Sequence, residues 1–566
     1  MRGKLKAVVF DLDDTLYDCT GTLLEASRRR AAKVLVESGL PLSGDQALDL
    51  QRELAEQQGP HFLVFDEIAR RYGLDDEVIE KAYRAYNSDA VGDIELFPDV
   101  VPTLEFLRAH GVLCFLLTSG IHKRQSAKIR KLGLEQAFDE TAIIDVDRGG
   151  LMSESLRYLL DKHRLRPDEA LVVGDRPQEE IRVGNDLGAT TAQVLHGRFS
   201  AFEPRDNRER AEYRIAGVFQ IPTILRLVNV NKPPQSLKIV AIGGGTGLPI
   251  VLEGCKTYCR DLTAIVTVTD SGRSSGRLRD ELGILPPGDA RNCLVALSEP
   301  GQRERLLNQL FQYRFDRGSL AGTSLGNLVI AAMTDIEGSF ERGIRVLSRL
   351  LSIQGQVLPP TLEDCHICAE LEDGSTREGE VNVREVGKPP IRRVYLKPEA
   401  PPAHDEAVQA ILNADIVVIG PGSLYTSVIS NLLVPGIREA LTRTEASKVY
   451  VCNIVTQPGQ TDGLVASGHL RAVLETVGEG GVDYALVNTQ RPSDQIMERY
   501  RAEGAGLVEP DDGLKGLNVP IVEAYLAEDL DITRVLWEKQ DLLRHHPDKL
   551  ADAICRVHTG LSPASP

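Results

Sequence analysis

Long apolar runs are missing from this sequence, and no stretch reaches the length that a membrane span requires. A surplus of basic residues is missing as well. The sequence has 65 lysines and arginines against 82 aspartates and glutamates, which gives a formal net charge of −17. Non-specific nucleic-acid binding depends on basic surface, so nucleic acid is not expected as a partner. Low-complexity tracts are also absent, and 566 residues are enough for more than one domain.

Cysteine spacing typical of a disulfide framework is absent too. The nine cysteines are scattered along the chain, which favours reduced thiols in a cytoplasmic protein. Asp11, Asp13 and Asp14 interrupt the first apolar stretch too early for a secretory signal. We therefore expect a cytoplasmic protein without a membrane span. The sequence leaves open whether it forms a homo-oligomer.

A glycine-rich turn lies near the start of the longer half of the chain. Residues 238–248 read KIVAIGGGTGL, which predicts a buried strand, a tight turn and a helix from Thr246. The three glycines from Gly243 let a ligand approach the backbone, and the free N–H groups at the helix start form an anion site. Leu248 stands where the dinucleotide fingerprint has its third glycine. A turn that binds nothing is therefore the alternative to a phosphate or nucleotide site.

The first strand of the chain ends in acidic residues. Residues 7–16 read AVVFDLDDTL, and on a strand Asp11 and Asp13 share a face while Asp14 points away. Two carboxylates placed in this way can hold a divalent cation, and one can attack while the other transfers protons. The pattern favours a catalytic or metal-binding site over an acidic surface strand.

Further polar groups follow later strands of this first half. Residues 16–96 have helical periodicity and predict a helical insertion. A buried strand over 112–117 then runs into Thr118, and the next apolar strand reaches Asp175, with Glu180 five residues beyond it. The carboxyl ends of parallel strands meet at one edge of a sheet, so we expect these groups to form one site.

Three motifs in the first half share their order with a known family: FDLDDT at 10–15, LLTSG at 116–120 and VVGDRPQEEI at 172–181. With a helical cap between the first two, this half resembles the haloacid dehalogenase-like hydrolases. The resemblance implies a magnesium-dependent phosphatase. It implies that Asp11 is the nucleophile, that Asp13 protonates the leaving group and then activates water, and that Thr118 bonds the phosphoryl oxygens. The residues implied to form the metal site are Asp11, Asp13, Asp175 and Glu180.

The lysine that this family places before its last motif is absent, because residues 145–160 contain none. We predict that Arg148 supplies the missing positive charge. Lys128 and Lys131, on an earlier predicted helix, fit the family less well. A missing cation among carboxylates would lower the rate strongly, so a degraded or regulatory domain is the alternative to a slow phosphatase.

Four loops of the longer half combine small residues, hydroxyl groups and charges: 243–247, 270–277, 420–427 and 456–461. Each follows a predicted strand, so we expect them to meet at one edge of a parallel sheet. Hydroxyl and N–H groups bond phosphate, and arginine binds it with two parallel hydrogen bonds. The residues expected to bind a nucleotide ligand are Gly243, Gly244, Gly245, Thr246, Gly247, Asp270, Arg273, Ser275, Arg277, Asn327, Gly422, Ser423, Tyr425 and Thr456.

Five ordered motifs of this half are IGGGTGL from 242, TDSGRSSGRLRDELGILPPGDARN from 269, SLGNL from 324, ADIVVIGPGSLYTS from 414 and NIVTQPGQT from 453. Through them it resembles the gluconeogenesis factor family, relatives of 2-phospho-L-lactate transferase. The resemblance implies a Rossmann-like domain that binds a nucleotide or nucleotide-sugar, typically a UDP-sugar, and a role in gluconeogenic growth and cell shape. Ser271, Arg273 and Gln460 depart from the family pattern, which weakens the expectation of a metal there.

The expected fold class is α/β with two Rossmann-like domains. A haloacid dehalogenase-like domain is expected over 1–228 with its helical cap at about 16–96, a linker over 229–236 and a nucleotide-binding parallel-sheet domain over 237–566. We expect a gluconeogenesis factor that binds a UDP-sugar, fused to a phosphatase-like domain for a small phosphorylated metabolite. The alternative is a bifunctional enzyme, a nucleotide-dependent phospho-group transferase joined to a magnesium-dependent phosphatase.

Overall fold

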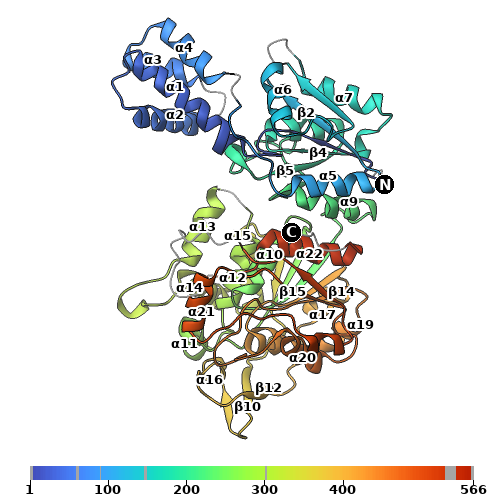
Figure 1. Cartoon of the computed structure of the whole chain (residues 1–566). Coiled ribbons are helices and arrows are strands. Elements are labelled where there is room, and N and C mark those ends of the chain that lie inside the picture. The colour runs from blue at the N-terminus through green and yellow to red at the C-terminus, as the bar shows by residue number, and fades with distance from the viewer. Residues whose placement is uncertain are drawn as a thin grey trace. The chain divides into compact units, whose positions relative to one another are not determined.

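The computed structural model describes residues 4–58, 63–88, 91–145, 150–299, 302–528 and 543–561. The chain folds into two compact units that divide between Asn231 and Lys232, and Figure 1 shows their elements. Within the predicted linker, Asn229 is the last residue of a helix, whereas Lys232 Nζ lies 2.6 Å from Asp415 Oδ1 in the second unit.

A six-stranded parallel sheet forms the centre of the first unit, in the order β3-β2-β1-β4-β5-β6. Its strands are β1 Ala7–Phe10, β2 Leu113–Ser119, β3 Glu140–Ile144, β4 Ala170–Gly174, β5 Thr190–Val194 and β6 Tyr213–Ile215. The strands β1 and β4 are fully buried apolar runs, as expected for parallel strands covered on both faces. The strand β5 is also fully buried, although it contains polar residues.

Helices cover this sheet and supply a separate cap. The helices around the sheet are α5 Val100–Ala109, α6 His122–Lys131, α7 Met152–Lys162, α8 Arg182–Leu187 and α9 Ile221–Asn229. The cap helices are α1 Glu25–Glu37, α2 Gly44–Gln58, α3 Val64–Tyr72 and α4 Asp76–Tyr86. The cap has its own apolar core, which includes Leu35, Leu54 and Ile68, and Figure 1 shows it beside the sheet of its unit.

The second unit is built on a seven-stranded parallel sheet in the order β16-β15-β14-β13-β7-β8-β9. Its strands are β7 Lys238–Gly243, β8 Asp261–Val266, β9 Gln356–Leu358, β13 Ile416–Ile419, β14 Ser447–Val451, β15 Tyr484–Asn488 and β16 Ile521–Ala524. The predicted α/β class with two parallel sheets is therefore confirmed.

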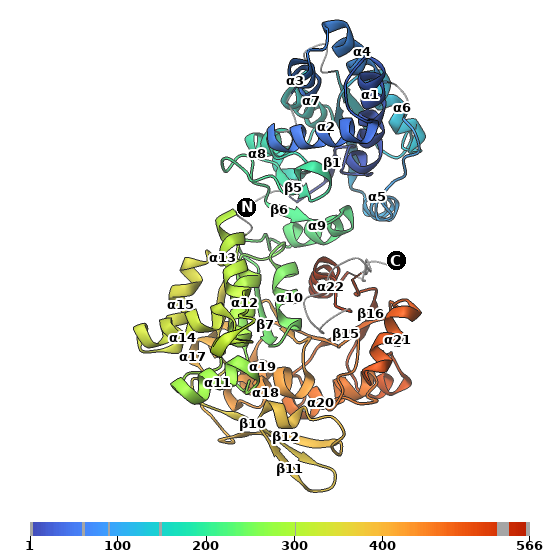
Figure 2. The ribbon, with the colours of Figure 1, turned by 90° about the vertical axis from the view of Figure 1, so that its left-hand side faces the viewer.

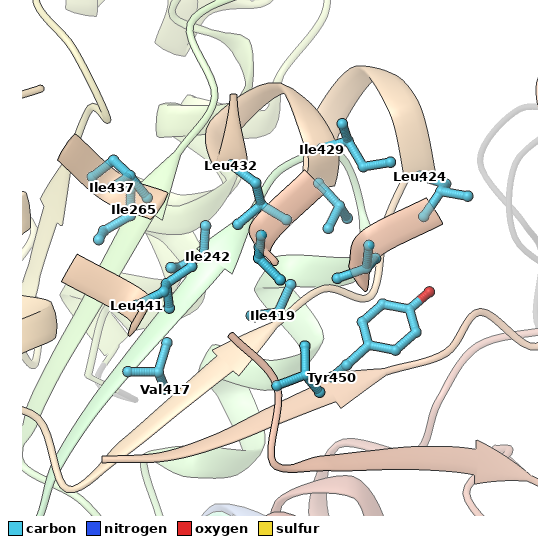
Figure 3. Close-up of a cluster of buried hydrophobic side chains, with 14 of the residues drawn as sticks. Ile242, Ile265, Val417, Ile419, Leu424, Ile429, Leu432, Ile437, Leu441 and Tyr450 are labelled. Carbon is cyan, nitrogen blue, oxygen red and sulfur yellow. The ribbon is translucent and has the colours of Figure 1, made fainter. Parts of the chain in front are cut away.

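The helices of the second unit pack around this sheet. They are α10 Gly247–Cys255, α11 Arg273–Leu282, α12 Gly288–Leu297, α13 Gln302–Gln312, α14 Leu325–Glu337, α15 Phe340–Leu350, α16 Glu380–Val383, α17 Asp405–Leu412, α18 Ser430–Leu432, α19 Pro435–Arg443, α20 Ala466–Val477, α21 Asp494–Ala502 and α22 Pro547–Thr559. In the core, side chains of β7, β8 and β13 meet those of α18 and α19 (Figure 3). Ile242, Ile419 and Leu432 are each fully buried there.

A small antiparallel sheet projects from an end of the second unit (Figure 2). Its strands are β10 His366–Leu371, β11 Thr376–Glu378 and β12 Ile391–Lys397, in the order β11-β10-β12. The short helix α16 follows β11 and carries Glu380 back toward the parallel sheet.

Each parallel sheet has one point at which the strand order reverses. In the first unit this point lies between β1 and β4, and in the second between β7 and β13. Ligands of open parallel sheets bind at the carboxyl ends of the strands at such a point. Within the described residues, no helix combines the length and apolar character that a bilayer span requires.

Candidate functional site

Asp11 is the first residue after β1, at the carboxyl edge of the first sheet. Its N–H donates to the carbonyl of Val173 in β4 at 2.9 Å, which fixes the chain as it leaves the strand. Burial raises the pKa of Asp11 to about 7, while Arg176 opposes the rise and Asp13 adds to it. Further positive charge would keep this carboxyl ionised and nucleophilic at neutral pH.

Asp13 is held by a lysine from α6. Lys128 Nζ lies 2.8 Å from Oδ1 and 2.7 Å from Oδ2 of Asp13, and the Tyr17 hydroxyl donates to Oδ1 at 2.6 Å. Burial is the largest influence and would raise the pKa of Asp13, but the Lys128 ammonium, the Tyr17 hydroxyl and Arg176 together outweigh burial and lower it. Asp13 is therefore ionised, and Lys128 brings a buried positive charge into the site.

The chain leaves β1 through an irregular turn rather than a longer strand. Asp14 has a left-handed φ of 56°, a conformation in which Asp is found more often than most residues. Its carboxylate accepts hydrogen bonds from the N–H of Thr20 at 2.7 Å and from its hydroxyl at 2.5 Å. Asp14 thus stabilises the path of the chain into the cap.

Thr118 lies near the end of β2, and its hydroxyl is buried. Gln125 Nε2 donates to Thr118 Oγ1 at 2.9 Å and to the Ser119 carbonyl at 2.8 Å, and lies 3.3 Å from Asp13 Oδ2. Gln125 and Lys128 are three residues apart and share one face of α6. The helix that follows β2 therefore brings an amide and an ammonium group to the same aspartate.

The third group of residues follows β4. Arg176 Nη1 donates to Glu179 Oε2 at 2.9 Å, and its backbone N–H donates to Glu180 Oε2 at 3.3 Å. Burial raises the pKa of Asp175 and of Glu180 well above the usual range, and the charge of Asp11 adds to both. Burial would lower the pKa of Arg176, but the surrounding carboxylates outweigh it and raise that pKa. Arg176 is thus a second cation in the site, and the sequence analysis did not select it.

Part of the expected donor set suits Mg²⁺. Asp11 Oδ2, Asp175 Oδ1 and Glu180 Oε1 are buried and have no hydrogen-bond partner among the described residues, and such oxygens are hard ligands of the kind that Mg²⁺ prefers. Both carboxylate oxygens of Asp13, the fourth expected ligand, are instead bound by Lys128. In the described ranges, no group of three or more His, Cys, Asp or Glu side chains is arranged to hold a metal. Mg²⁺ would therefore need backbone, water or substrate oxygens as well.

Arg148, the predicted source of the missing positive charge, lies outside the described residues, so its role stays a prediction. Of the two lysines ranked below it, Lys128 reaches the site, whereas Lys131 lies at the surface, 3.2 Å from Asp93. A helical projection of α6 could have separated them, because Lys128 lies beside the buried Ile129 on the face toward the sheet.

In the second unit, the glycine turn joins β7 to α10 at the reversal point of the sheet. Gly245 has a left-handed φ of 65°, which glycine adopts without strain. A Cβ on Gly247 would lie 2.4 Å from the carbonyl oxygen of Pro421, so the turn after β7 and the loop after β13 pack directly together. Gly243, Gly244 and Thr246 complete this turn.

An aspartate binds one N–H group of this turn. Gly245 N–H donates to Asp289 Oδ2 at 2.8 Å, from the first turn of α12. Burial raises the pKa of Asp289 to about 6, and the charge of Asp270 adds to the rise. The expected anion site therefore carries a carboxyl group, which is negatively charged above about pH 6.

Asp270 and Glu380 extend this acidic cluster. Asp270, in the loop after β8, accepts a hydrogen bond from the N–H of Gly272 at 2.8 Å. Burial raises the pKa of Glu380 to about 8, and its hydrogen bond with Asp270 adds to the rise. Glu380 thus keeps its proton below about pH 8, beside the acidic side chain of Asp270.

The α11 side chains point toward α14. Arg277 Nη2 donates to Thr323 Oγ1 at 3.1 Å, in the loop before α14, rather than to the glycine turn. Ser275 Oγ is buried and lies 3.4 Å from Asn327 Nδ2. Arg273 is the first residue of α11, and its side chain lies outside the described part of the structure.

Asn327 is buried against an arginine that the sequence analysis did not select. Arg291 Nη1, from α12, donates to Asn327 Oδ1 at 3.1 Å and also contacts Ser324 Oγ. Burial lowers the pKa of Arg291 to about 10. Its place two residues after Asp289, in the motif PPGDARN, was the available signal.

The loop after β13 is held by neighbouring backbone and side chains. Gly422 N–H donates to Asn453 Oδ1 at 3.1 Å, and Asn453 Nδ2 donates back to the Gly422 carbonyl at 2.8 Å. Ser423 is buried, and Tyr425 is half-buried with a pKa raised by burial. Thr456 Oγ1 accepts from the N–H of a glycine fifty residues later at 2.8 Å. These bonds fix the loops before any ligand binds.

Comparisons with known proteins match a different family in each of the two units. The family model of 2-phospho-L-lactate transferase CofD matches residues 239–527, and the model of haloacid dehalogenase-like hydrolases matches residues 5–188. The gluconeogenesis factor of Halalkalibacterium halodurans is 48% identical over 318 residues, 56% of this chain and 95% of that protein. The gluconeogenesis factor of Bacillus subtilis is 43% identical over 322 residues, 56% of this chain and 98% of that protein.

A solved structure is also similar to this chain over the length of the gluconeogenesis factor match. The crystal structure of a upf0052 family protein from Bacillus halodurans matches with a TM-score of 0.53 and 46% sequence identity, over 56% of this chain and 99% of that chain. Both predicted resemblances and the two Rossmann-like domains are thereby confirmed. The chain belongs to the 2-phospho-L-lactate transferase CofD family, has gluconeogenesis factors among its relatives, and carries an additional haloacid dehalogenase-like hydrolase domain.

Proposed function

We propose that the second unit binds a nucleotide-sugar, UDP-glucose or UDP-N-acetylglucosamine, and that the first unit hydrolyses a small phosphate ester with Mg²⁺. In this proposal the chain is a cytoplasmic gluconeogenesis factor that supports growth on gluconeogenic carbon and cell shape. The observation that carries the binding function is the packing of the glycine turn against the loop after β13, at the reversal point of the sheet.

The loops of this crevice support a preformed nucleotide site. Asn431 Nδ2 donates to the carbonyl of Gly243 at 3.0 Å. The side chain of Asn453 bonds both the N–H and the carbonyl of Gly422. The diphosphate would lie at the helix start after Gly245, where N–H groups and the helix dipole favour negative charge. A rigid site loses little entropy on binding, which suits a micromolar affinity of roughly −8 kcal/mol.

Titration calorimetry on the full chain tests the binding function. Gly245→Val should weaken UDP-sugar binding at least tenfold, because its side chain projects where the phosphates would lie. Gly283→Val is the matched control, since Gly283 also has a φ of 65° but caps α11 away from the glycine turn. If neither UDP-sugar binds the folded protein, or if Gly245→Val binds as wild type does, the site is not here.

The side chains of the first unit support a phosphoryl-transfer cycle. Asp11 attacks phosphorus and the bond to the leaving oxygen breaks, while Asp13 gives that oxygen a proton. Asp13 then takes a proton from water, and the water oxygen attacks phosphorus and frees Asp11. Mg²⁺, when bound by Asp11 and Asp175, would offset the negative charge of the carboxylate and the phosphate. Because Lys128 keeps Asp13 ionised, proton donation is the weaker of its two roles.

A further inference from the structure

Three arginines from separate parts of the first unit gather around one tyrosine. Arg28 lies on the cap helix α1, Arg124 on α6 and Arg198 in the short turn after β5, and Tyr86 ends the cap helix α4. Burial raises the pKa of Tyr86, while Arg198, Arg28 and Arg124 all lower it, so all three guanidinium groups act on the same phenol. Figure 1 shows that α1 belongs to the cap and α6 to the sheet side of this unit.

Hydrogen bonds fix part of this arginine cluster. Arg124 Nη2 donates to the hydroxyl of Ser27 on α1 at 2.9 Å, and Arg30 Nη2 donates to the same hydroxyl at 2.9 Å. Arg30 Nε also donates to the carbonyl of Ala85 at 3.1 Å, which ties α1 to α4. The buried Nε of Arg124 has no partner among the described residues. These hydrogen bonds hold Arg124 in place, and its Nε–H group can still donate a hydrogen bond to a ligand.

The arginine cluster lies beside the catalytic aspartates. A Cβ on Gly197 would lie 2.3 Å from Asp14 Oδ2, so the turn that carries Arg198 packs against the loop after β1. Arg198 also opposes the rise in the pKa of Asp175. On the cap side, the turn that contains Cys19 packs against the turn of Arg198. An extended substrate at Asp11 could therefore reach the cluster.

No arginine of the cluster forms an ion pair with an acidic side chain within the described residues, although Asp175 and Glu25 lie within electrostatic range. Neither Arg28 nor Arg198 forms an ion pair there, and Arg124 bonds a neutral hydroxyl group. Arg28 is half-buried, and burial and the charge of Arg198 both lower its pKa, while Tyr86 and Glu25 oppose this. Like charges that are partly removed from water are stabilised when an anion binds between them, and guanidinium groups bind phosphate and carboxylate with paired hydrogen bonds.

We propose that Arg28, Arg124 and Arg198 bind a second anionic group of the substrate, a phosphate or a carboxylate, while its phosphoryl group is attacked by Asp11. The inference rests on the proposed phosphatase function and names its substrate class: small phosphate monoesters that carry a second phosphate or a carboxylate. The cap supplies Arg28 and the sheet side supplies Arg124 and Arg198. Such a substrate bridges the two and holds the site closed around the phosphoryl group.

Matched substrate pairs test the proposal on the full chain. Glucose 1,6-bisphosphate is compared with glucose 1-phosphate, and phosphoglycolate with 2-hydroxyethyl phosphate, so the two pairs separate a second phosphate from a carboxylate. We expect kcat/KM to be at least about tenfold higher for the member of one pair that carries the second anionic group. The double variant Arg28→Gln, Arg198→Gln should bring that ratio close to one.

A control variant and a binding measurement complete the test. Arg29→Gln lies on the same helix, but its side chain is 61% exposed and pairs with Glu25, so the ratio should stay at the wild-type value. Calorimetry in an Asp11→Asn background gives the same comparison without turnover. One outcome separates the two proposals. If no substrate is hydrolysed, the phosphatase proposal fails. The anion site still stands if the ligand with the second anionic group binds at least tenfold more tightly than its partner and the arginine variants remove this preference. A ratio near one for both pairs in the wild type, or a preference that survives the arginine variants, overturns the anion site.

Discussion

The buried carboxyl groups of the two sites differ in whether their oxygens have hydrogen-bond partners. In the first unit, Asp11 and Asp175 have buried oxygens without hydrogen-bond partners among the described residues. Arg176 brings positive charge to both, and Lys128 pairs with the neighbouring Asp13. In the second unit, Asp289 accepts a hydrogen bond from the glycine turn of its own fold. Unpartnered carboxylates beside cations suit a site that binds a metal and moves protons, whereas satisfied ones suit a preformed ligand crevice. The difference is consistent with our proposal of chemistry in the first unit and recognition in the second.

The largest expected effect comes from removing the nucleophile. Asp11→Asn should lower phosphate-ester hydrolysis at least about a thousandfold, because the amide keeps the shape of the side chain but cannot attack phosphorus. Phosphate release from a panel of esters measures it. Equal rates for the variant and the wild type would show that Asp11 is not the nucleophile. They would also contradict the catalytic role that we assign to the first unit.

Removing the metal should have the next largest effect. Chelation of Mg²⁺ should lower the rate about a hundredfold or more, because the charge of the attacking carboxylate is no longer offset. Burial holds the pKa of Asp11 at about 7 without a cation, and a bound cation lowers it. Saturating Mg²⁺ should therefore move the acid limb of the pH–rate profile to lower pH. A chelator that leaves rate and profile unchanged would contradict the metal site.

Substitution of Lys128 tests the buried cation of the first site. Lys128→Gln should lower kcat at least about tenfold and move the limb that reports Asp13 to higher pH, because burial then acts on Asp13 without the opposing ammonium. Lys128→Arg should restore the limb. Arg148→Ala in the same assay tests the other candidate cation, and a profile that only Arg148→Ala changes would assign the role to Arg148.

Lys128→Gln should also change the free energy of unfolding in a pH-dependent way. Lys128 lowers the folded-state pKa of Asp13, so their pairing stabilises the fold above the unfolded-state pKa and is lost as pH falls through the folded-state value. Removing one partner of a buried pair costs about 3–5 kcal/mol. The difference in free energy of unfolding between wild type and Lys128→Gln should therefore be large at neutral pH and shrink in acid. A difference independent of pH would show that Asp13 is not the partner.

The smallest effect is expected at Asp289. Asp289→Asn keeps an acceptor for Gly245 N–H but removes a charge that is present above about pH 6. UDP-sugar affinity at pH 8 should rise roughly two- to fivefold, since the diphosphate no longer meets a like charge, and the gain should disappear near pH 5. Calorimetry at both values measures it, and a weaker affinity at pH 8 would show that the carboxylate helps binding.

Sequence reasoning reached the fold because the strands are continuous apolar runs. The glycine turn, the strand before Asp11 and the strand before Asp175 each lie where the pattern placed them, within one or two residues. Parallel strands are buried on both faces, so their composition is distinctive. The cap was visible through its helical periodicity over 16–96.

The charge network of the sites was less accessible to sequence reasoning. A helical projection favours Lys128 over Lys131, but only the fold shows that α6 and the turn after β4, which carries Arg176, face the same strand ends. Arg277 was expected at the glycine turn but bonds Thr323, because the direction of a helical side chain depends on which neighbour packs against it. Arg291 lies within the motif from 269 that carries the family resemblance, but the sequence does not show which side chains of that motif are buried.

One paired measurement tests the division of labour between the units. Phosphate-ester hydrolysis and UDP-sugar affinity are measured on Asp11→Asn and on Gly245→Val, both as full chains. Our account predicts that Asp11→Asn abolishes hydrolysis and binds UDP-sugar within twofold of wild type, and that Gly245→Val loses binding at least tenfold and keeps hydrolysis. Loss of both functions in either folded variant, or hydrolysis that survives Asp11→Asn, would contradict it.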